Sequence, residues 1–233
     1  MFRTNNIITV SLAVIALLTA SVTYARDENT NPLTGRIGVD PKDDSPEAIK
    51  ARSGPGNATA GRDKSQLCQG CHGEFGNSTE PLVPKLAGQY GKYIAKELRN
   101  YQAGVRTHQI MNAMAGTISD DDLADIAAYF ASQPKMKGSG PENELGKKLF
   151  TKGDINRKMI ACINCHGVHG KGLTPNTSMF PVLGGQQKEY LRKQLHNFQD
   201  VDRTNSPNAI MNKVTNKLTN DEIDAIAEYL SAQ

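Results

Sequence analysis

Apolar residues follow a helical spacing in two segments of the chain and return at the same spacing in two later ones. One pattern occupies residues 93–101 and returns over 190–198. A second occupies 123–130 and returns over 223–230, each time directly after a hydroxyl residue and a group of polar or acidic residues. Apolar positions three and four residues apart form one face of a helix, and a hydroxyl followed by acids is typical of a helix start. The patterning therefore predicts a middle helix and a terminal amphipathic helix in each half of an all-α chain.

These patterns are part of a longer internal duplication. The segment PKLAGQ at residues 84–89 returns as PVLGGQ at 181–186, and the tripeptide IMN at 110–112 returns at 210–212. The distance between matching positions grows slowly along the chain, as small loop insertions would produce. Self-similarity of this kind indicates that one domain has been duplicated.

The duplication divides the chain into two predicted domains. One extends over residues 61–133 and the other over 141–233, and the stretch 134–140, rich in Pro and Gly, is the predicted linker. A further helix is expected near the start of each domain, most clearly over 144–152. Residues 26–60 are polar and without periodicity. We expect them to form a flexible extension with no core of its own, or alternatively a segment that docks a partner or acts as a lid.

The first residues have the pattern of a secretory signal peptide. Arg3 precedes an apolar run from Ile7 to Ala20, and small residues then place a cleavage site after Ala25. The run is short for a bilayer span, which needs about 20 apolar residues. We therefore expect residues 1–25 to be removed on export to the periplasm. The alternative is an uncleaved anchor, which would hold the protein at the membrane.

Composition and charge narrow the function classes without naming a partner. The formal net charge is only +3, and the chain lacks the basic stripe with interleaved aromatic residues that is typical of nucleic-acid binding. Tryptophan is absent and aromatic residues make up 6% of the chain, which leaves little material for two independent cores. Bound groups are therefore expected to supply part of the apolar volume.

All four cysteines belong to two copies of one motif, CxxCH. The copies are Cys68-Gln-Gly-Cys71-His72 and Cys162-Ile-Asn-Cys165-His166. At this spacing the two thiols can bond the two vinyl groups of one porphyrin, and the adjacent histidine can ligate its iron, so each copy is a c-type haem attachment signature. Zinc sites and dithiol redox pairs do not require a histidine directly after the second cysteine. We predict two covalently attached haem c groups and no disulfide.

Each iron needs a sixth ligand, and the duplication selects a candidate. Within the predicted domains, the candidates that follow the motifs are His108, Met111 and Met114 in the first and His169, Met179, His196 and Met211 in the second. Met111 and Met211 alone occupy equivalent places in the two copies. We predict that they ligate the irons opposite His72 and His166, in preference to a second histidine. A thioether ligand favours Fe(II) and so raises the reduction potential.

The histidine ligands need partners of their own. A histidine that ligates a metal commonly donates its other ring N–H to an acceptor, which fixes the orientation of the ring. The carbonyl groups of Pro84 and Pro181, at equivalent places in the two copies, are the candidates. The alternative is that these prolines are ordinary turn residues.

Each copy has the same order of elements: haem motif, Pro-x-Leu-x-Gly-Gln loop, middle helix, methionine loop and terminal helix. With this order and its duplication, the chain resembles the dihaem cytochrome c4 family of bacterial class I cytochromes c. The resemblance covers roughly residues 60–233 and is carried by CQGCHG and CINCHG, PKLAGQ and PVLGGQ, both IMN segments, and DLADIAAYF and EIDAIAEYL. It implies two tandem class I cytochrome c domains, each wrapped around one covalent haem, with the haems close together. It also implies His72, Met111, His166 and Met211 as iron ligands. The long polar segment before Gly61 departs from the family pattern.

These features predict an electron carrier. Two irons with complete ligand sets can exchange electrons with little change in geometry, and they offer a substrate no open position. The resemblance implies a quinol-oxidising complex or a dehydrogenase as donor and a terminal oxidase or reductase as acceptor. The alternatives are an electron-accepting haem subunit of a larger dehydrogenase and a dihaem peroxidase, in which one iron would need an open site. A haem-based gas sensor is a further alternative, although no output domain is visible.

Overall fold

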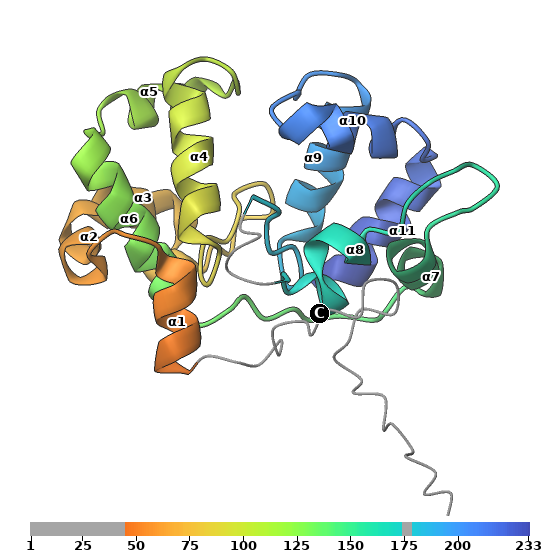
Figure 1. The fold of residues 1–233 in the computed structure, drawn as a ribbon, viewed down its shortest axis with the longest axis horizontal. Helices are drawn as coiled ribbons and strands as arrows, with labels where there is room; N and C mark the ends of the chain where they lie inside the picture. Colours follow the sequence, from red (N-terminus) through yellow and green to blue (C-terminus); the bar gives the residue numbers. More distant parts are fainter. Residues whose placement is uncertain (1–44, 174–178) are drawn as a thin grey trace, which may run out of the picture.

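The computed structural model describes residues 45–173 and 179–233, and within these ranges the regular secondary structure is helical apart from one isolated β-bridge. Figure 1 shows two helical halves side by side, with the connection between them running along one end. The predicted signal peptide, residues 1–25, and most of the predicted extension lie outside the described residues. None of the helices in the described part is long and apolar enough to cross a membrane.

Apart from α1 (Pro46–Ser53) in the first half and the 3₁₀ turn η4 (Pro207–Ala209) in the second, the two halves use equivalent helices in the same order. The first half contains α1 (Pro46–Ser53), α2 (Ala58–Lys64), α3 (Gln66–His72), the short 3₁₀ turn η1 (Glu74–Gly76), α4 (Gly91–Gln102), α5 (Gln109–Gly116) and α6 (Asp120–Ser132). The second half contains α7 (Glu144–Lys152), α8 (Ile163–His166), η2 (Val168–Gly170), α9 (Lys188–Gln199), η4 (Pro207–Ala209), α10 (Ile210–Thr215) and α11 (Asn220–Ser231). The predicted middle helices are α4 and α9, and the predicted terminal helices are α6 and α11.

Helix starts follow the predicted capping chemistry. The Ser119 hydroxyl accepts a hydrogen bond from the backbone N–H of Asp122 at the start of α6. At the start of α11, Thr219 and Glu222 form a reciprocal capping box. Because such caps satisfy amide groups that have no partner inside the helix, they fix where each terminal helix begins.

A glycine sets the crossing of two helices in each half. In the first half, a Cβ atom placed on Gly61 of α2 would lie 2.0 Å from the backbone oxygen of Asp125 in α6. In the second half, a Cβ on Gly146 of α7 would lie 2.0 Å from the backbone oxygen of Ala225 in α11. Only glycine lets the backbones approach this closely. The two crossings therefore fix the terminal helix against the helix near the start of each half.

The expectation of a flexible extension over residues 26–60 is wrong for the part that the structure describes. Residues 46–53 form α1, and α2 begins at Ala58, before the predicted domain boundary at residue 61. The Arg52 side chain is buried, and its Nε and Nη2 donate to the backbone oxygens of Ala131 and Gln133 at the end of α6. A cation at the carbonyl end of a helix is stabilising. Hydrophobic periodicity does not reveal this helix because its buried residue is a charged one, Arg52.

The predicted linker is packed rather than loose. Residues 133–143, between α6 and α7, contain no helix. Met136 within it is 1% exposed and packs with Tyr90 of the first half and Val182 of the second. The backbone N–H of Gly138 donates to the backbone oxygen of Gln233 at 2.6 Å. The connection therefore contributes to the contact between the halves.

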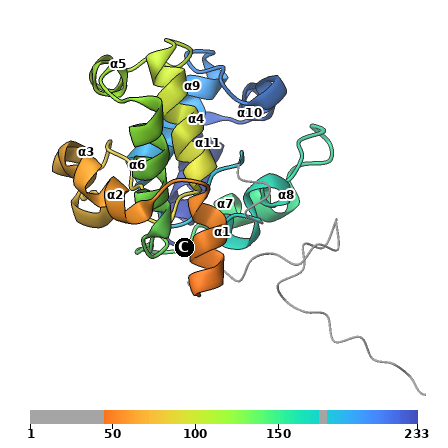
Figure 2. The same ribbon diagram turned by 60° about the vertical axis from the view of Figure 1, so that its left-hand side comes forward.

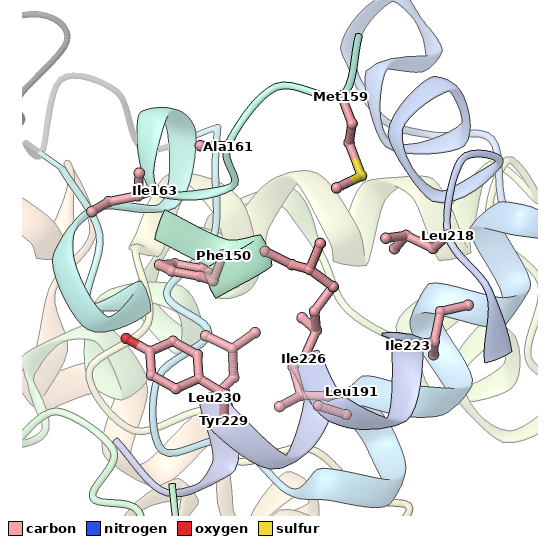
Figure 3. Close-up of a cluster of buried hydrophobic side chains, with 12 residues drawn as sticks. Phe150, Met159, Ala161, Ile163, Leu191, Leu218, Ile223, Ile226, Tyr229 and Leu230 are labelled. Carbon is pink, nitrogen blue, oxygen red and sulfur yellow. The ribbon is translucent and has the colours of Figure 1, made fainter. Parts of the chain in front are cut away.

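Each half has its own core of helix faces. In the second half, Phe150 of α7, Leu191 of α9 and Ile226 of α11 belong to one buried cluster, whose side chains point toward one another in Figure 3. In the first half, the equivalent cluster joins Ile94 of α4 with Phe130 of α6. The predicted amphipathic faces of the middle and terminal helices are thus the ones that are buried.

Candidate haem-binding sites

The two CxxCH motifs fold in the same way. The first lies in α3 and the second ends in α8, so that each histidine is the last residue of a helix and a glycine follows it. His72 is 7% exposed and His166 is 5% exposed, and all four cysteines are free of disulfides. Burial raises the pKa of the Cys162 thiol to about 12. Each motif therefore presents two free thiols and one buried imidazole on a short segment.

The prediction for the proline carbonyls is confirmed. His72 Nδ1 lies 2.8 Å from the backbone oxygen of Pro84, and His166 Nδ1 lies 2.9 Å from that of Pro181. A carbonyl oxygen only accepts hydrogen bonds, so Nδ1 carries the proton and Nε2 keeps a free lone pair. Burial lowers the pKa of both imidazoles, an effect that the bond to the carbonyl opposes. Both rings are thus neutral at pH 7 and oriented as metal ligation requires.

Met111 lies in α5 and Met211 in α10, so the predicted methionine loops are short helices. An asparagine holds each of them, a role for which the sequence gives no direct signal. Asn112, the residue after Met111, donates from Nδ2 to the backbone oxygens of Tyr101 and Arg106 at 2.6 and 3.0 Å. Asn212, the residue after Met211, makes the equivalent bonds to Phe198 and Arg203 at 2.7 and 2.8 Å. Each asparagine therefore ties its methionine to the end of the middle helix. The repeat of IMN was the available signal.

In the second half, the predicted haem residues line one apolar cavity. Cys162, Cys165, His166 and Met211 all contribute to its wall, and apolar side chains of α7, α9 and α11 complete it. In the first half, Cys68 and Met111 pack against the same buried cluster. A haem c needs two thiols, an imidazole, a sixth ligand and an apolar pocket, so the residues present fit this group.

Two of the three histidines that could replace methionine as ligands lie away from the cavity of the second half, and the third lies beside Met111. His169 is exposed, and its Nδ1 is 2.7 Å from Oε1 of Gln233. Neither His169 nor His196 contributes to the wall of the cavity in the second half. His108 caps the start of α5, where its Nδ1 accepts from the backbone N–H of Met111 at 3.3 Å. His108 is therefore the histidine best placed to replace Met111 as an iron ligand, because it is close to Met111 in sequence and is hydrogen-bonded to its backbone.

A buried polar cluster joins the halves, and hydrophobic patterning did not reveal it. Arg106 and Arg203, which occupy equivalent places in the two copies, both donate to Oε2 of Glu97, at 2.7 and 3.1 Å. Both also donate to Oε1 of Gln194, the residue equivalent to Glu97 in the second copy. Each guanidinium lies over the aromatic ring at the end of its own middle helix, Tyr101 or Phe198. The cluster is nearly symmetric, with one carboxylate shared by two cations.

This cluster lies where the middle helices meet. Figures 1 and 2 both show α4 and α9 next to each other at the centre of the molecule. Arg106 Nη2 donates to the hydroxyl of Tyr190 in α9, and Arg203 Nη2 donates to the hydroxyl of Tyr93 in α4. Two reciprocal contacts of this kind indicate that the halves face each other about a local twofold axis.

Comparisons with known proteins agree with this architecture. A sequence model of the cytochrome c family matches residues 58–134 and again residues 143–233. Cytochrome c4 of Pseudomonas aeruginosa is 43% identical over 178 residues, with 75% of this chain and 88% of that protein covered. The chain belongs to the cytochrome c4 family. As in this family, it is a dihaem electron-transfer protein and not an enzyme, and its cofactors are two covalent haem c groups.

Two further similarities bear on the fold and on partners. The crystal structure of reduced recombinant cytochrome c4 from Pseudomonas stutzeri matches with a TM-score of 0.72 at 39% identity, and covers 76% of this chain and 99% of that one. The predicted all-α fold of two tandem cytochrome c domains is thus confirmed. The thiosulfate dehydrogenase electron acceptor of Thiomonas intermedia is 30% identical over 185 residues, with 77% of this chain and 84% of that protein covered.

Proposed function

We propose that this member of the cytochrome c4 family shuttles electrons in the periplasm from a quinol-oxidising membrane complex or a dehydrogenase to a terminal oxidase or reductase. The observation that carries the proposal is the equivalence of the two sites, in which the imidazole, its carbonyl partner and the methionine loop recur together. Two equivalent sites with complete ligand sets suit storage and transfer of charge better than substrate chemistry.

The proposal assigns a role to each residue of the two motifs. Cys68, Cys71, Cys162 and Cys165 form thioethers, His72 and His166 are the proximal ligands, and Met111 and Met211 are the sixth ligands. A bound haem c supplies one reversible electron at its iron. The proline carbonyls hold the proton on Nδ1 of each histidine, so that Nε2 stays available. The asparagines hold the methionine loops, and the apolar helix faces exclude water.

Domain limits and location complete the proposal. The first haem domain ends at residue 133, the linker occupies 134–140, and the second domain extends over 141–233, with α1 and α2 added to the first. Residues 1–25 act as the signal peptide that directs the chain to the periplasm, a location that c-type haem attachment in bacteria also requires. We propose that its partners are redox proteins and not nucleic acids.

One alternative has an observation in its favour. The similarity to the thiosulfate dehydrogenase electron acceptor of Thiomonas intermedia favours a role as the electron-accepting partner of a dehydrogenase. This role keeps the same electron-transfer chemistry and changes only the donor. A dihaem peroxidase, by contrast, requires one iron without a methionine ligand, and the equivalent Met111 and Met211 loops argue against it.

Stopped-flow reduction of the oxidised holoprotein tests the proposal. Membranes of the producing organism with added quinol should reduce both haems within the turnover time of their quinol-oxidising enzymes. The same membranes under oxygen should reoxidise the reduced protein. Reduction by a thiosulfate dehydrogenase with thiosulfate, but not by quinol and membranes, would favour the alternative. Peroxide turnover by the purified protein would contradict both roles.

A further inference from the structure

Two glutamines, one from each half, clasp a loop of the opposite half, in the sense that each side chain forms two hydrogen bonds to the backbone of one residue there. Gln186 of the second half accepts from the backbone N–H of Lys85 at 2.8 Å through Oε1 and donates to the backbone oxygen of Lys85 at 2.9 Å through Nε2. Gln89 of the first half does the same to Val182, with both distances at 2.9 Å. Both glutamine side chains are buried, at 4% and 5% exposure. The clasp is therefore reciprocal and shielded from water.

The clasped residues directly follow the prolines that hold the proximal histidines. The N–H of Lys85 and the C=O of Pro84 belong to a single peptide group, which is planar and rigid. Gln186 binds the N–H side of this group, and His72 binds its C=O side. Each histidine is thus connected to a glutamine of the other half through one rigid unit.

The second histidine has the same connection in the opposite direction. Gln89 accepts from the N–H of Val182, and His166 donates to the carbonyl of Pro181 in the same peptide group. In both cases two hydrogen bonds share one peptide, in the order glutamine oxygen, N–H, C=O and imidazole N–H. Hydrogen bonds in such a chain polarise and strengthen one another.

We propose that Gln186 positions His72 and that Gln89 positions His166, so that each half of the molecule sets the hydrogen bond of the other half's proximal histidine. The inference rests on the proposed role of these histidines as iron ligands. A strong bond from Nδ1–H makes the imidazole a more basic ligand, which favours Fe(III). Loss of a glutamine therefore weakens that bond and raises the reduction potential of the haem in the opposite half.

Crossed substitutions in the holoprotein test the inference. Gln186→Met and Gln89→Met keep the side-chain length and remove both hydrogen bonds to the opposite half. Each also removes a bond within its own half, from the backbone N–H of Gln187 to Gln186 or of Tyr90 to Gln89. Gln186→Met should raise the potential of the first haem, and should speed exchange of the His72 Nδ1 proton about twofold, because the bond to Pro84 is weakened by about 10–30% and not lost. Gln89→Met should have the same effects on the second haem and on His166. NMR of the reduced protein and a redox titration followed by NMR separate the two sites.

Two further variants control for general loosening of the interface. Gln187 also bonds across the halves, from Nε2 to the backbone oxygen of Ser78 at 2.6 Å, but it does not bind a proline-containing peptide. Gln187→Met should therefore leave both histidine protons unchanged. Gln186→Glu keeps an acceptor for the Lys85 N–H, but its second oxygen can replace the bond to the Lys85 carbonyl oxygen only while the carboxyl is protonated. It should therefore retain the slow exchange at His72 at low pH and lose it as the carboxyl ionises.

The outcomes separate the inference from the proposed function. A crossed pattern, with each substitution acting on the opposite half, supports it. Effects on the same half, equal effects on both halves, or no effect would overturn it. Haem content and the near-infrared band of a thioether bound to ferric iron report the proposed ligand set independently. If haem content and the near-infrared band are normal but the crossed pattern is absent, only the inference about the glutamines fails. If the unsubstituted protein lacks the two haems or the band, the proposed function is contradicted.

Discussion

Glu97 provides the sharpest test of how the two halves are held together. Its carboxylate is the one acid that Arg106 and Arg203 share in the buried cluster, and Gln194 is its counterpart in the second copy. Glu97→Gln therefore places at residue 97 the amide that the second copy already carries in the equivalent place. The size is unchanged, so the substitution removes the negative charge and leaves the packing. We expect a lower free energy of unfolding.

The magnitude follows from the surroundings of the carboxylate. Burial alone would raise the pKa of Glu97, but the charges of Arg203, Arg106 and Lys96 outweigh it and lower the pKa from 4.5 to about 2. At 1.36 kcal/mol per pKa unit, the ionised carboxylate contributes about 3 kcal/mol at pH 7. Breaking a buried ion pair from one side costs about 3–5 kcal/mol. The two estimates agree, and we expect a loss of about 3–5 kcal/mol.

A charge swap provides the control. Gln194 Oε1 already accepts from Arg106 at 2.9 Å and from Arg203 at 2.8 Å, so Gln194→Glu places a carboxylate against the same two cations. The double variant Glu97→Gln/Gln194→Glu should regain most of the lost stability. Urea unfolding of the holoprotein at pH 7, followed by circular dichroism, measures each variant. Equal stability of the single variant and the parent, or no recovery in the double variant, would refute the reasoning.

Three other predictions follow from the same contacts. The stability advantage of the parent over Glu97→Gln should be constant from pH 7 to about 5 and shrink as pH falls from 4.5 toward 2, because a depressed pKa contributes stability only while the group is ionised; urea midpoints across this range measure it. Met111→Ala should convert one haem to a high-spin form that binds carbon monoxide, and an unchanged optical spectrum would mean that another group, with His108 the foremost candidate, is the ligand. Gly61→Ala should cost about 1–3 kcal/mol of unfolding free energy because its Cβ meets the backbone oxygen of Asp125. Gly116→Ala, where nothing lies within 4 Å, is the control, and equal urea midpoints for the two alanine variants would contradict the packing argument.

Helices that bury an apolar face could be predicted from the sequence. The middle helix α4 and the terminal helix α6, with their copies α9 and α11, show the spacing of residues that ends up in the cores. The caps at Ser119 and Thr219 could also be predicted, because capping needs only a few neighbouring residues. These features depend on short-range patterns, which a sequence shows directly.

Contacts between polar groups that are distant in sequence could not be predicted in the same way. Helix α1 has no apolar face, and its buried residue is Arg52, which binds the end of α6, so hydrophobic spacing predicts no helix there. Gln89 and Gln186 end the two repeated segments PKLAGQ and PVLGGQ, but their hydrogen-bond partners lie in the opposite half and could not be predicted. The proline carbonyls were predicted correctly because the chemistry of a ligating histidine demands an acceptor, whereas nothing in the sequence states which residue a buried glutamine will bind.

The central claim is that both irons are held between an imidazole and a thioether, so that only electrons enter and leave. A redox titration of the purified holoprotein, with optical and paramagnetic resonance spectra at each step, tests it most directly. We predict two low-spin haems, each with the near-infrared band of a thioether bound to ferric iron, and no exchangeable water on either iron. A high-spin component in the native protein, or the absence of that band at either haem, would contradict the claim.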